Sequence, residues 1–119
     1  MSDEFIKIAT AEINEEISEI STILNSCKNN EDVYKNSKNF QSHTHKIKGL
    51  APMMGQEELG TICSTLDYVL KQINEGKKVD GIFDILVESL PHMRNSMSKI
   101  GYDMRPITDK ITDFSSSLK

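Results

Sequence analysis

Hydrophobic residues recur every three or four positions along almost the whole chain, and polar residues fill the positions between them. This spacing gathers hydrophobic side chains on one side of a helix, whereas a half-buried strand would alternate residue by residue. The pattern predicts four long helices, at about 3–26, 32–54, 56–75 and 80–100, and a shorter helix at about 107–118. The hydrophobic stripes include Ile6 in the first helix and Ile100 in the fourth.

Short polar segments and glycines separate the predicted helices, and two prolines fall inside them. We expect Pro52 to kink the last turn of the second helix and Pro91 to bend the fourth, because proline removes a backbone donor. Long amphipathic helices joined by short loops bury their hydrophobic sides best in an antiparallel bundle. The expected fold is therefore all-α, an antiparallel four-helix bundle with the shorter fifth helix on its outside or end.

The length and composition favour one domain in the reducing cytoplasm. A chain of 119 residues suits a single domain, spanning 1–119, with a hydrophobic core of its own. Cys27 and Cys63 lie on hydrophobic helix positions without the spacing of metal ligands, which favours buried free thiols. The acidic N-terminus is unlike a signal peptide, and no apolar run approaches the ~20 residues that span a membrane. The net charge of −4 disfavours nucleic acid as a partner, since proteins that bind its phosphates are usually basic.

Candidate chemistry is concentrated in one stretch, SHTHKIKGLAPMMG, at 42–55 of the second predicted helix. At 100° per residue, His45 points roughly 130° away from the hydrophobic side of that helix. Lys48 and Gly49 follow His45 by three and four residues, so they lie one turn further along the same side. The pattern therefore places a cation, and a position without a side chain, next to an exposed imidazole.

Phosphoryl transfer through histidine would use all three of these features. A neutral, accessible imidazole can attack phosphorus, and histidine titrates near neutral pH. A nearby ammonium offsets the negative charge of the phosphoryl group, and a missing side chain leaves room for a partner's active site. Glycine inside a helix costs about 0.5–1 kcal/mol relative to alanine, so its presence at Gly49 indicates a specific use.

The residues His45, Lys48, Gly49 and Gly55 resemble the H-x-x-K-G-x5-G motif of histidine-containing phosphotransfer domains. The likeness is greatest to the N-terminal phosphotransfer domains of CheA-type chemotaxis histidine kinases, and it covers nearly the whole chain. In that family the motif lies on the second helix of a helical bundle. The resemblance implies that His45 accepts a phosphoryl group on Nε2, that Lys48 stabilises its charge, and that Gly49 gives the partner access.

The same resemblance assigns roles to neighbouring residues. CheA-type domains place a glutamate on the third helix, hydrogen-bonded to the histidine ring, and Asp67 stands at the matching position. Asp67 is thus a candidate to hold Nδ1–H of His45 and to leave Nε2 as the nucleophile. Ser64 occupies the position of a second histidine that these domains often carry, and Pro52 is another departure. We assign Lys46, with Gly49, to the surface that meets the partner.

The resemblance also implies the partners. They are the catalytic domain of a histidine kinase, which binds ATP and donates the phosphoryl group, and a response-regulator receiver domain, whose aspartate accepts it, in chemotaxis-type signalling. The chain has no nucleotide-binding loop, so we expect no autonomous catalytic activity, no cofactor and no metal. We expect a monomeric domain, either separate or the N-terminal part of a longer kinase.

Other interpretations of the histidines and of the function remain open. His43 also precedes a lysine, Lys46, by three residues, but Ile47 stands where the glycine should be. A metal site formed by His43, His45 and His92 is disfavoured, because the side chains of an H-x-H pair diverge on a helix. The alternative function is a helical interaction or adaptor module that needs no phosphorylation.

Overall fold

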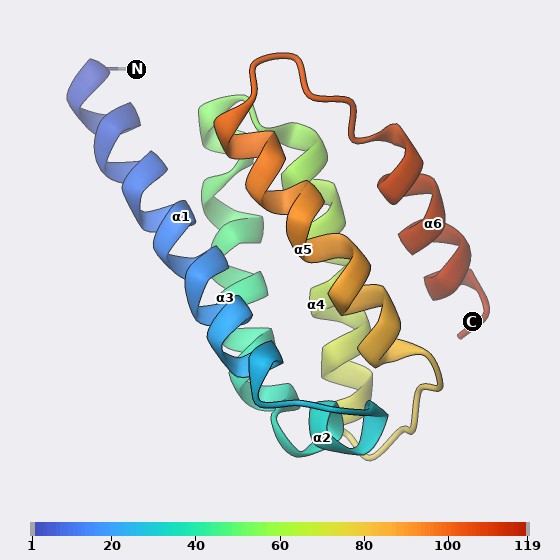
Figure 1. The fold of residues 1–119 in the computed structure, drawn as a ribbon. Coiled ribbons are helices and arrows are strands. Elements are labelled where there is room, and N and C mark those ends of the chain that lie inside the picture. The colour runs from blue at the N-terminus through green and yellow to red at the C-terminus, as the bar shows by residue number, and fades with distance from the viewer. Residues whose placement is uncertain (1, 119) are drawn as a thin grey trace.

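The hydrophobic periodicity of the sequence is realised as helices throughout. The structure, a computed structural model, describes residues 2–118 and shows no strand within that range. Its elements are α1 (Asp3–Asn25), α2 (Asn30–Lys35), α3 (Ser37–Leu50), the 3₁₀ helix η1 (Pro52–Met54), α4 (Glu57–Asn74), α5 (Ile82–Ser98) and α6 (Arg105–Ser116). The long helices α1, α3, α4 and α5 lie alongside one another, and α6 packs against α4 and α5 (Figure 1). The expected all-helical fold is confirmed.

The second predicted helix is divided, which corrects the expectation of one continuous helix at 32–54. Asn36 leaves the helical conformation, with φ −107° and ψ 11°, and its side-chain amide donates to the carbonyl oxygen of Asp32. Asparagine competes with the backbone for hydrogen bonds in this way, so it favours helix ends over helix interiors. α3 therefore begins only at Ser37, and a separate 3₁₀ turn begins at Pro52, which has no backbone N–H to donate.

A tight turn sends α4 back along α3. Gly55 has φ 77°, in the left-handed region that glycine enters without steric cost. Pro52 lies against Gly60 near this turn, and at the far end Ser37 donates a hydrogen bond of 2.6 Å to the side chain of Asn74. α3 and α4 consequently run antiparallel and pack more extensively than any other pair of helices, so the middle of α3 faces the middle of α4.

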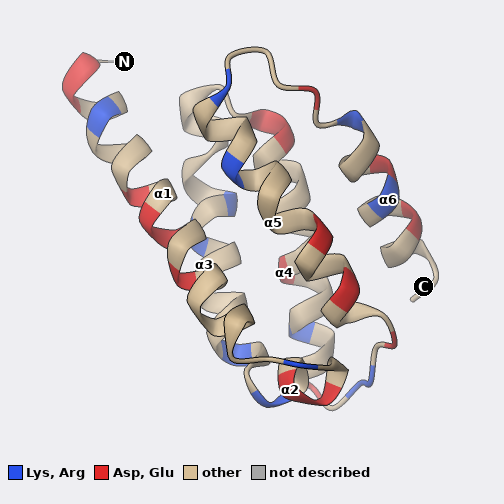
Figure 2. Ribbon diagram, in the orientation of Figure 1, with Lys and Arg blue, Asp and Glu red and all other residues tan. Residues whose placement is uncertain are grey.

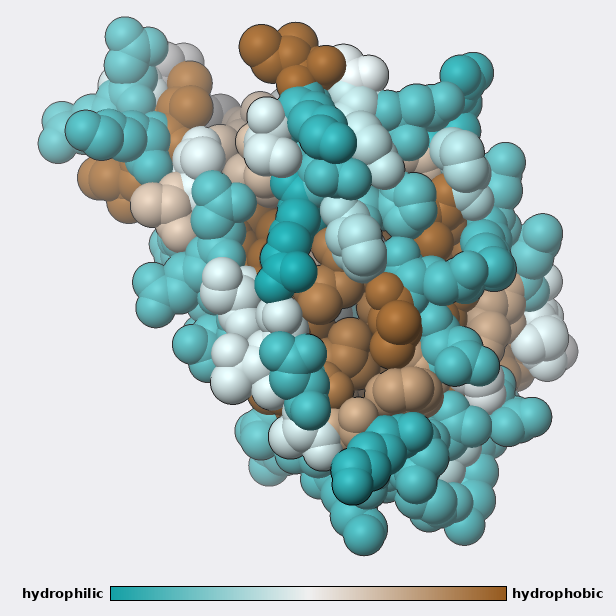
Figure 3. All heavy atoms as spheres, in the orientation of Figure 1, coloured by the Kyte–Doolittle hydropathy of each residue, from teal (hydrophilic) through white to brown (hydrophobic). Residues whose placement is uncertain are grey.

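One hydrophobic core joins all of the α-helices. Its fully buried large side chains come from α1, α3, α4, α5 and α6 and comprise Phe40, Ile13, Ile17, Ile20, Ile47, Leu59, Ile62, Leu66, Leu70, Ile82, Met93 and Ile111. On the face shown in Figure 3, hydrophobic residues are visible in the middle of the molecule, and hydrophilic residues cover most of the surface around them. Within residues 2–118, no helix combines the length and hydrophobicity needed to cross a membrane.

Two residues expected on buried stripes are exposed instead. Ile6 is 41% exposed, on the first turns of α1, which extend past the other helices (Figure 1). Ile100 is fully exposed because α5 ends at Ser98, two residues earlier than the hydrophobic pattern predicts.

Candidate functional site

His45 projects from the middle of α3 into solvent. Its side chain is 67% exposed, whereas Thr44 and Ile47 on the same helix are completely buried. Neighbouring residues on a helix point about 100° apart, so His45 points outward when Thr44 and Ile47 face the core. The outward orientation predicted for His45 is confirmed.

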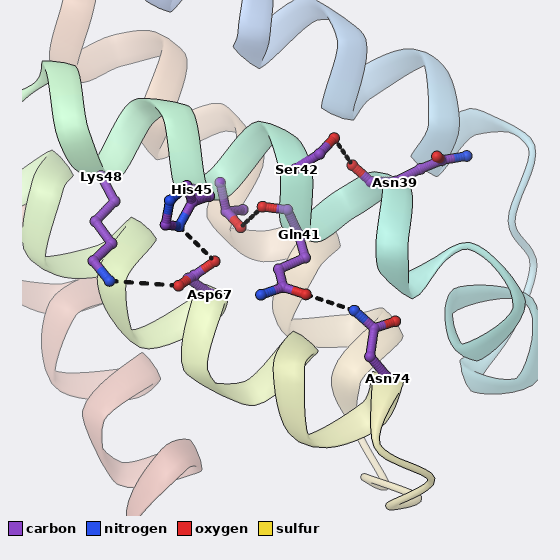
Figure 4. A network of polar contacts seen from close by, with 8 residues as sticks. Asn39, Gln41, Ser42, His45, Lys48, Asp67 and Asn74 are labelled. Carbon is purple, nitrogen blue, oxygen red and sulfur yellow. Dashed lines mark hydrogen bonds and ion pairs between the residues drawn. The ribbon is translucent and has the colours of Figure 1, made fainter.

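Asp67 of α4 lies against the side chains of His45 and Lys48 (Figure 4). Its Oδ1 atom is 3.5 Å from Nδ1 of His45, and its Oδ2 atom is 3.5 Å from Nζ of Lys48. The carboxylate is buried because Asp67 shares a side of α4 with Gly60 and Cys63, which are also buried. Two antiparallel helices thus bring together the histidine, the lysine and the carboxylate that the sequence singled out.

The Oδ1 atom of Asp67 lacks a hydrogen-bond partner among residues 2–118, although it is buried. Its separation of 3.5 Å from Nδ1 of His45 exceeds the 2.7–3.2 Å typical of a hydrogen bond. A buried acceptor without a donor costs roughly 1–3 kcal/mol, so a small movement of the exposed His45 ring toward Asp67 is favourable. Donation from Nδ1–H to Asp67 would leave the nucleophilic lone pair on Nε2.

Gly49 faces open space beside this group. A Cβ atom built at Gly49 meets nothing within 4 Å, so the helix packing does not require glycine there. Gly60, on α4, is different, because a Cβ atom there would lie 2.8 Å from Cγ of Pro52. Gly60 therefore has a packing function that the sequence did not reveal, and it allows the motif helix to end close against α4.

A second histidine on α3 makes a similar set of contacts on the opposite flank. Nδ1 of His43 is 2.7 Å from Oε1 of Glu16 on α1, and Nζ of Lys46 is 3.7 Å from the same oxygen. The side chain of His43 is only 17% exposed and that of Glu16 only 9%. His43 therefore links α1 to α3, and Lys46, which we assigned to the partner surface, lies beside this buried pair with 54% of its side chain exposed.

Glu16 is the contact residue that sequence reasoning missed. It lies between Ile13, Ile17 and Ile20, at positions that share the buried side of α1. An acidic residue within a hydrophobic stripe is the signal that could have identified it, because a buried carboxylate needs a donor or a cation.

His92 lies on α5 and forms no hydrogen bond with either group within residues 2–118. Its Nδ1 is 2.7 Å from the hydroxyl oxygen of Tyr102, in the loop that follows α5. The three histidines thus have three different partners, and the described part of the chain holds no cluster of metal-ligating side chains.

Both cysteines are free and buried. Cys63 lies one turn before Asp67 on α4, and burial, followed by the negative charge of Asp67, raises the pKa of its thiol. A thiol that stays protonated is a poor nucleophile, so Cys63 belongs to the core beneath the site.

Searches of protein-family models, of curated proteins and of solved structures yield no match to this chain. Functional inference therefore depends on the residues of the site and on the motif that they form.

Proposed function

We propose that this chain is a histidine-containing phosphotransfer domain of a two-component phosphorelay, similar to the CheA type. His45 would accept a phosphoryl group from the ATP-binding domain of a histidine kinase and pass it to the aspartate of a receiver domain. The single observation that carries the proposal is the exposed His45 ring with Nδ1 facing the buried, unpartnered Oδ1 of Asp67. In this proposal the four long helices form the antiparallel four-helix bundle of that family, and α6 lies outside it.

The proposed reaction is two successive phosphoryl transfers, and it needs only the residues of this chain and its two partners. The Nε2 lone pair attacks the γ-phosphorus of ATP held by the kinase, a P–N bond forms, and the P–O bond to ADP breaks. A receiver carboxylate oxygen then attacks the same phosphorus, and the P–N bond breaks with its electron pair returning to Nε2. The proton on Nδ1 stays on the His45 ring and is donated to the Asp67 carboxylate throughout, so Asp67 keeps the ring in the tautomer that reacts.

Lys48 and Gly49 support the same reaction. The Lys48 ammonium is 3.5 Å from Asp67 and 42% of its side chain is exposed, so it can reach an anion on the neighbouring ring. A positive charge at that point offsets the charge of the phosphoryl group in the transition state. The open space at Gly49 leaves room for a partner's active site over His45.

The proposal is tested with phosphoramidate, a small phosphodonor that needs no partner protein. We expect acid-labile, base-stable phosphate on Nε2 of His45, observed by ³¹P NMR. His45→Gln should abolish labelling and leave the melting temperature nearly unchanged, because substitution of an exposed residue usually costs within about 0.5 kcal/mol. His43→Gln is the matched control and should keep the label.

Two outcomes would contradict the proposal. Label that persists in His45→Gln and disappears in His43→Gln would move the acceptor to the α1 side of α3. Absence of any phosphohistidine, with the parent protein folded, would favour the adaptor module.

A further inference from the structure

Charge is strongly segregated between neighbouring helices. α1 carries six acidic residues, Asp3, Glu4, Glu12, Glu15, Glu16 and Glu19, against a single lysine, Lys7. α3 carries Lys38, Lys46 and Lys48 and no acidic residue. Figure 2 shows this difference as red segments along α1 and only blue ones on α3. A chain with a net charge of −4 therefore presents a basic helix at the site that carries His45.

The lysines are arranged around His45. Lys38 precedes His45 by seven residues, or two helical turns, and Lys48 follows it by three, so both lie on the His45 side of α3. On α4, Lys71 lies one turn beyond Asp67 and is exposed. We call the surface formed by Lys38, His45, Lys48 and Lys71 the basic face.

Opposite charges are scarce on the basic face. Within 38–50 and 60–74 the only acidic residue is Asp67, and its carboxylate is buried. Glu57, in the first turn of α4, is exposed and lines a pocket with Lys48, so opposite charge is present at the Lys48 end of the face. Lys38 and Lys71 form no ion pair with any residue of 2–118. Lys46 differs from them because it is 3.7 Å from Glu16 and lies toward α1. The charges of Lys38 and Lys71 are thus left for a partner, whereas Lys48 is also paired with Asp67.

We propose that the basic face is the docking surface for the acidic active-site rim of the receiver domain, and that Lys38 and Lys71 determine the rate of docking. This inference rests on the proposed function. A carboxylate that accepts a phosphoryl group with the help of Mg²⁺ needs further carboxylates to bind the metal, so the surface around it is acidic. Complementary charges accelerate encounter and fix the orientation of the two proteins more than they lengthen the life of the complex.

The test measures phosphotransfer from phosphoramidate-labelled protein to the individually purified receiver domains of the source organism. Lys38→Glu and Lys71→Glu should each lower kcat/KM roughly tenfold at low salt, since steering by charge changes association rates by about 10–10³-fold. The difference should shrink near 0.5 M salt, where the screening length is only about 4 Å. Lys7→Glu, the same charge change on an exposed residue of α1, is the matched control and should transfer at the parent rate.

A second measurement separates this inference from the proposed function. His45→Gln cannot be phosphorylated, so NMR titration of this variant with the same receivers reports docking without chemistry. Salt-sensitive binding that Lys38→Glu weakens supports the basic face, even if His45 proves not to be the acceptor. Equal rates for the parent, Lys38→Glu and Lys71→Glu at low salt would overturn the docking inference while leaving His45 phosphorylation intact.

One alternative occupant of the basic face is the acidic α1 of a second copy. Sedimentation at low salt distinguishes it: a dimer that dissociates in salt, and that Lys38→Glu abolishes, would overturn the assignment to a receiver domain. A monomer under these conditions supports it.

Discussion

At the scale of single residues, exposure separates two histidines with similar neighbours. His43 and His45 each place Nδ1 near a buried carboxylate and each precede a lysine by three residues. Their side chains are 17% and 67% exposed, respectively. In the proposed reaction, phosphorus approaches the ring within a partner's active site, so the greater exposure favours His45 as the acceptor and leaves His43 a role in packing.

Two glycines of the α3–α4 pair, Gly49 in the last turn of α3 and Gly60 in the first turn of α4, should respond oppositely to enlargement. Gly49→Ala should raise the free energy of unfolding by up to about 1 kcal/mol, because alanine is the better helix former and the added Cβ meets nothing. Gly60→Ala should lower it by roughly 1–3 kcal/mol, because the Cβ would crowd Pro52. Urea denaturation of both variants measures the difference.

Gly49→Gln tests whether the glycine is needed for phosphotransfer. It should leave stability within about 0.5 kcal/mol of the parent, as an exposed substitution does, while slowing transfer to a receiver domain. A destabilised Gly49→Gln protein with an unchanged transfer rate would mean that glycine serves the fold at this position.

At the scale of elements, α1 is attached to α3 by a buried polar pair as well as by hydrophobic contacts. Glu16 accepts a hydrogen bond of 2.7 Å when Nδ1 of His43 carries the proton. His43→Ala should lower the free energy of unfolding by about 1–3 kcal/mol, because it leaves the buried Glu16 carboxylate without this donor. Thermal or urea unfolding monitored by circular dichroism measures the loss.

The matched substitutions for this pair are on α1. Glu16→Gln should be destabilising when His43 is present, and the effects of the two changes should not add, since the residues are in contact. Glu15→Gln is the control, because Glu15 is exposed on the same turn. Additive effects of Glu16→Gln and His43→Ala would show that the pair does not hold α1 to α3.

At the scale of the whole molecule, Cys63 reports on opening of the core beneath the site. Burial raises the pKa of its thiol, and the Asp67 charge raises it further, so the thiol stays protonated at pH 8. Since the thiolate is the reactive form, Cys63 should resist iodoacetamide at pH 8 until the protein unfolds and the pKa returns to its ordinary value.

The measurement uses a Cys27→Ser background, so that alkylation reports Cys63 alone. The urea dependence of alkylation should coincide with the loss of helical circular dichroism. Rapid alkylation in the absence of urea would reveal local opening of α4 and a less rigid support for Asp67.

The local sequence was sufficient to predict five amphipathic segments, the outward direction of His45 and the proximity of Lys48 and Gly49. Each of these depends on residues three or four apart on one helix, and helical spacing alone determines which of them share a side. Gly55 likewise indicated the turn after the motif helix, but the helix ends at Leu50 and not at the predicted residue 54, because Pro52 starts a separate 3₁₀ turn. The sequence thus determined which side chains lie together on one helix.

Tertiary structure decided the contacts between helices. Distances between separate segments determine the packing of Gly60 against Pro52 and the pairing of Glu16 with His43. Competition for backbone hydrogen bonds determines the break at Asn36. The same holds for Asp67: the resemblance indicated its position, but only the antiparallel packing of α4 on α3 placed its carboxylate 3.5 Å from His45. Periodicity specifies the direction of a side chain about its own helix axis, whereas the register between two helices is set by how their surfaces fit together.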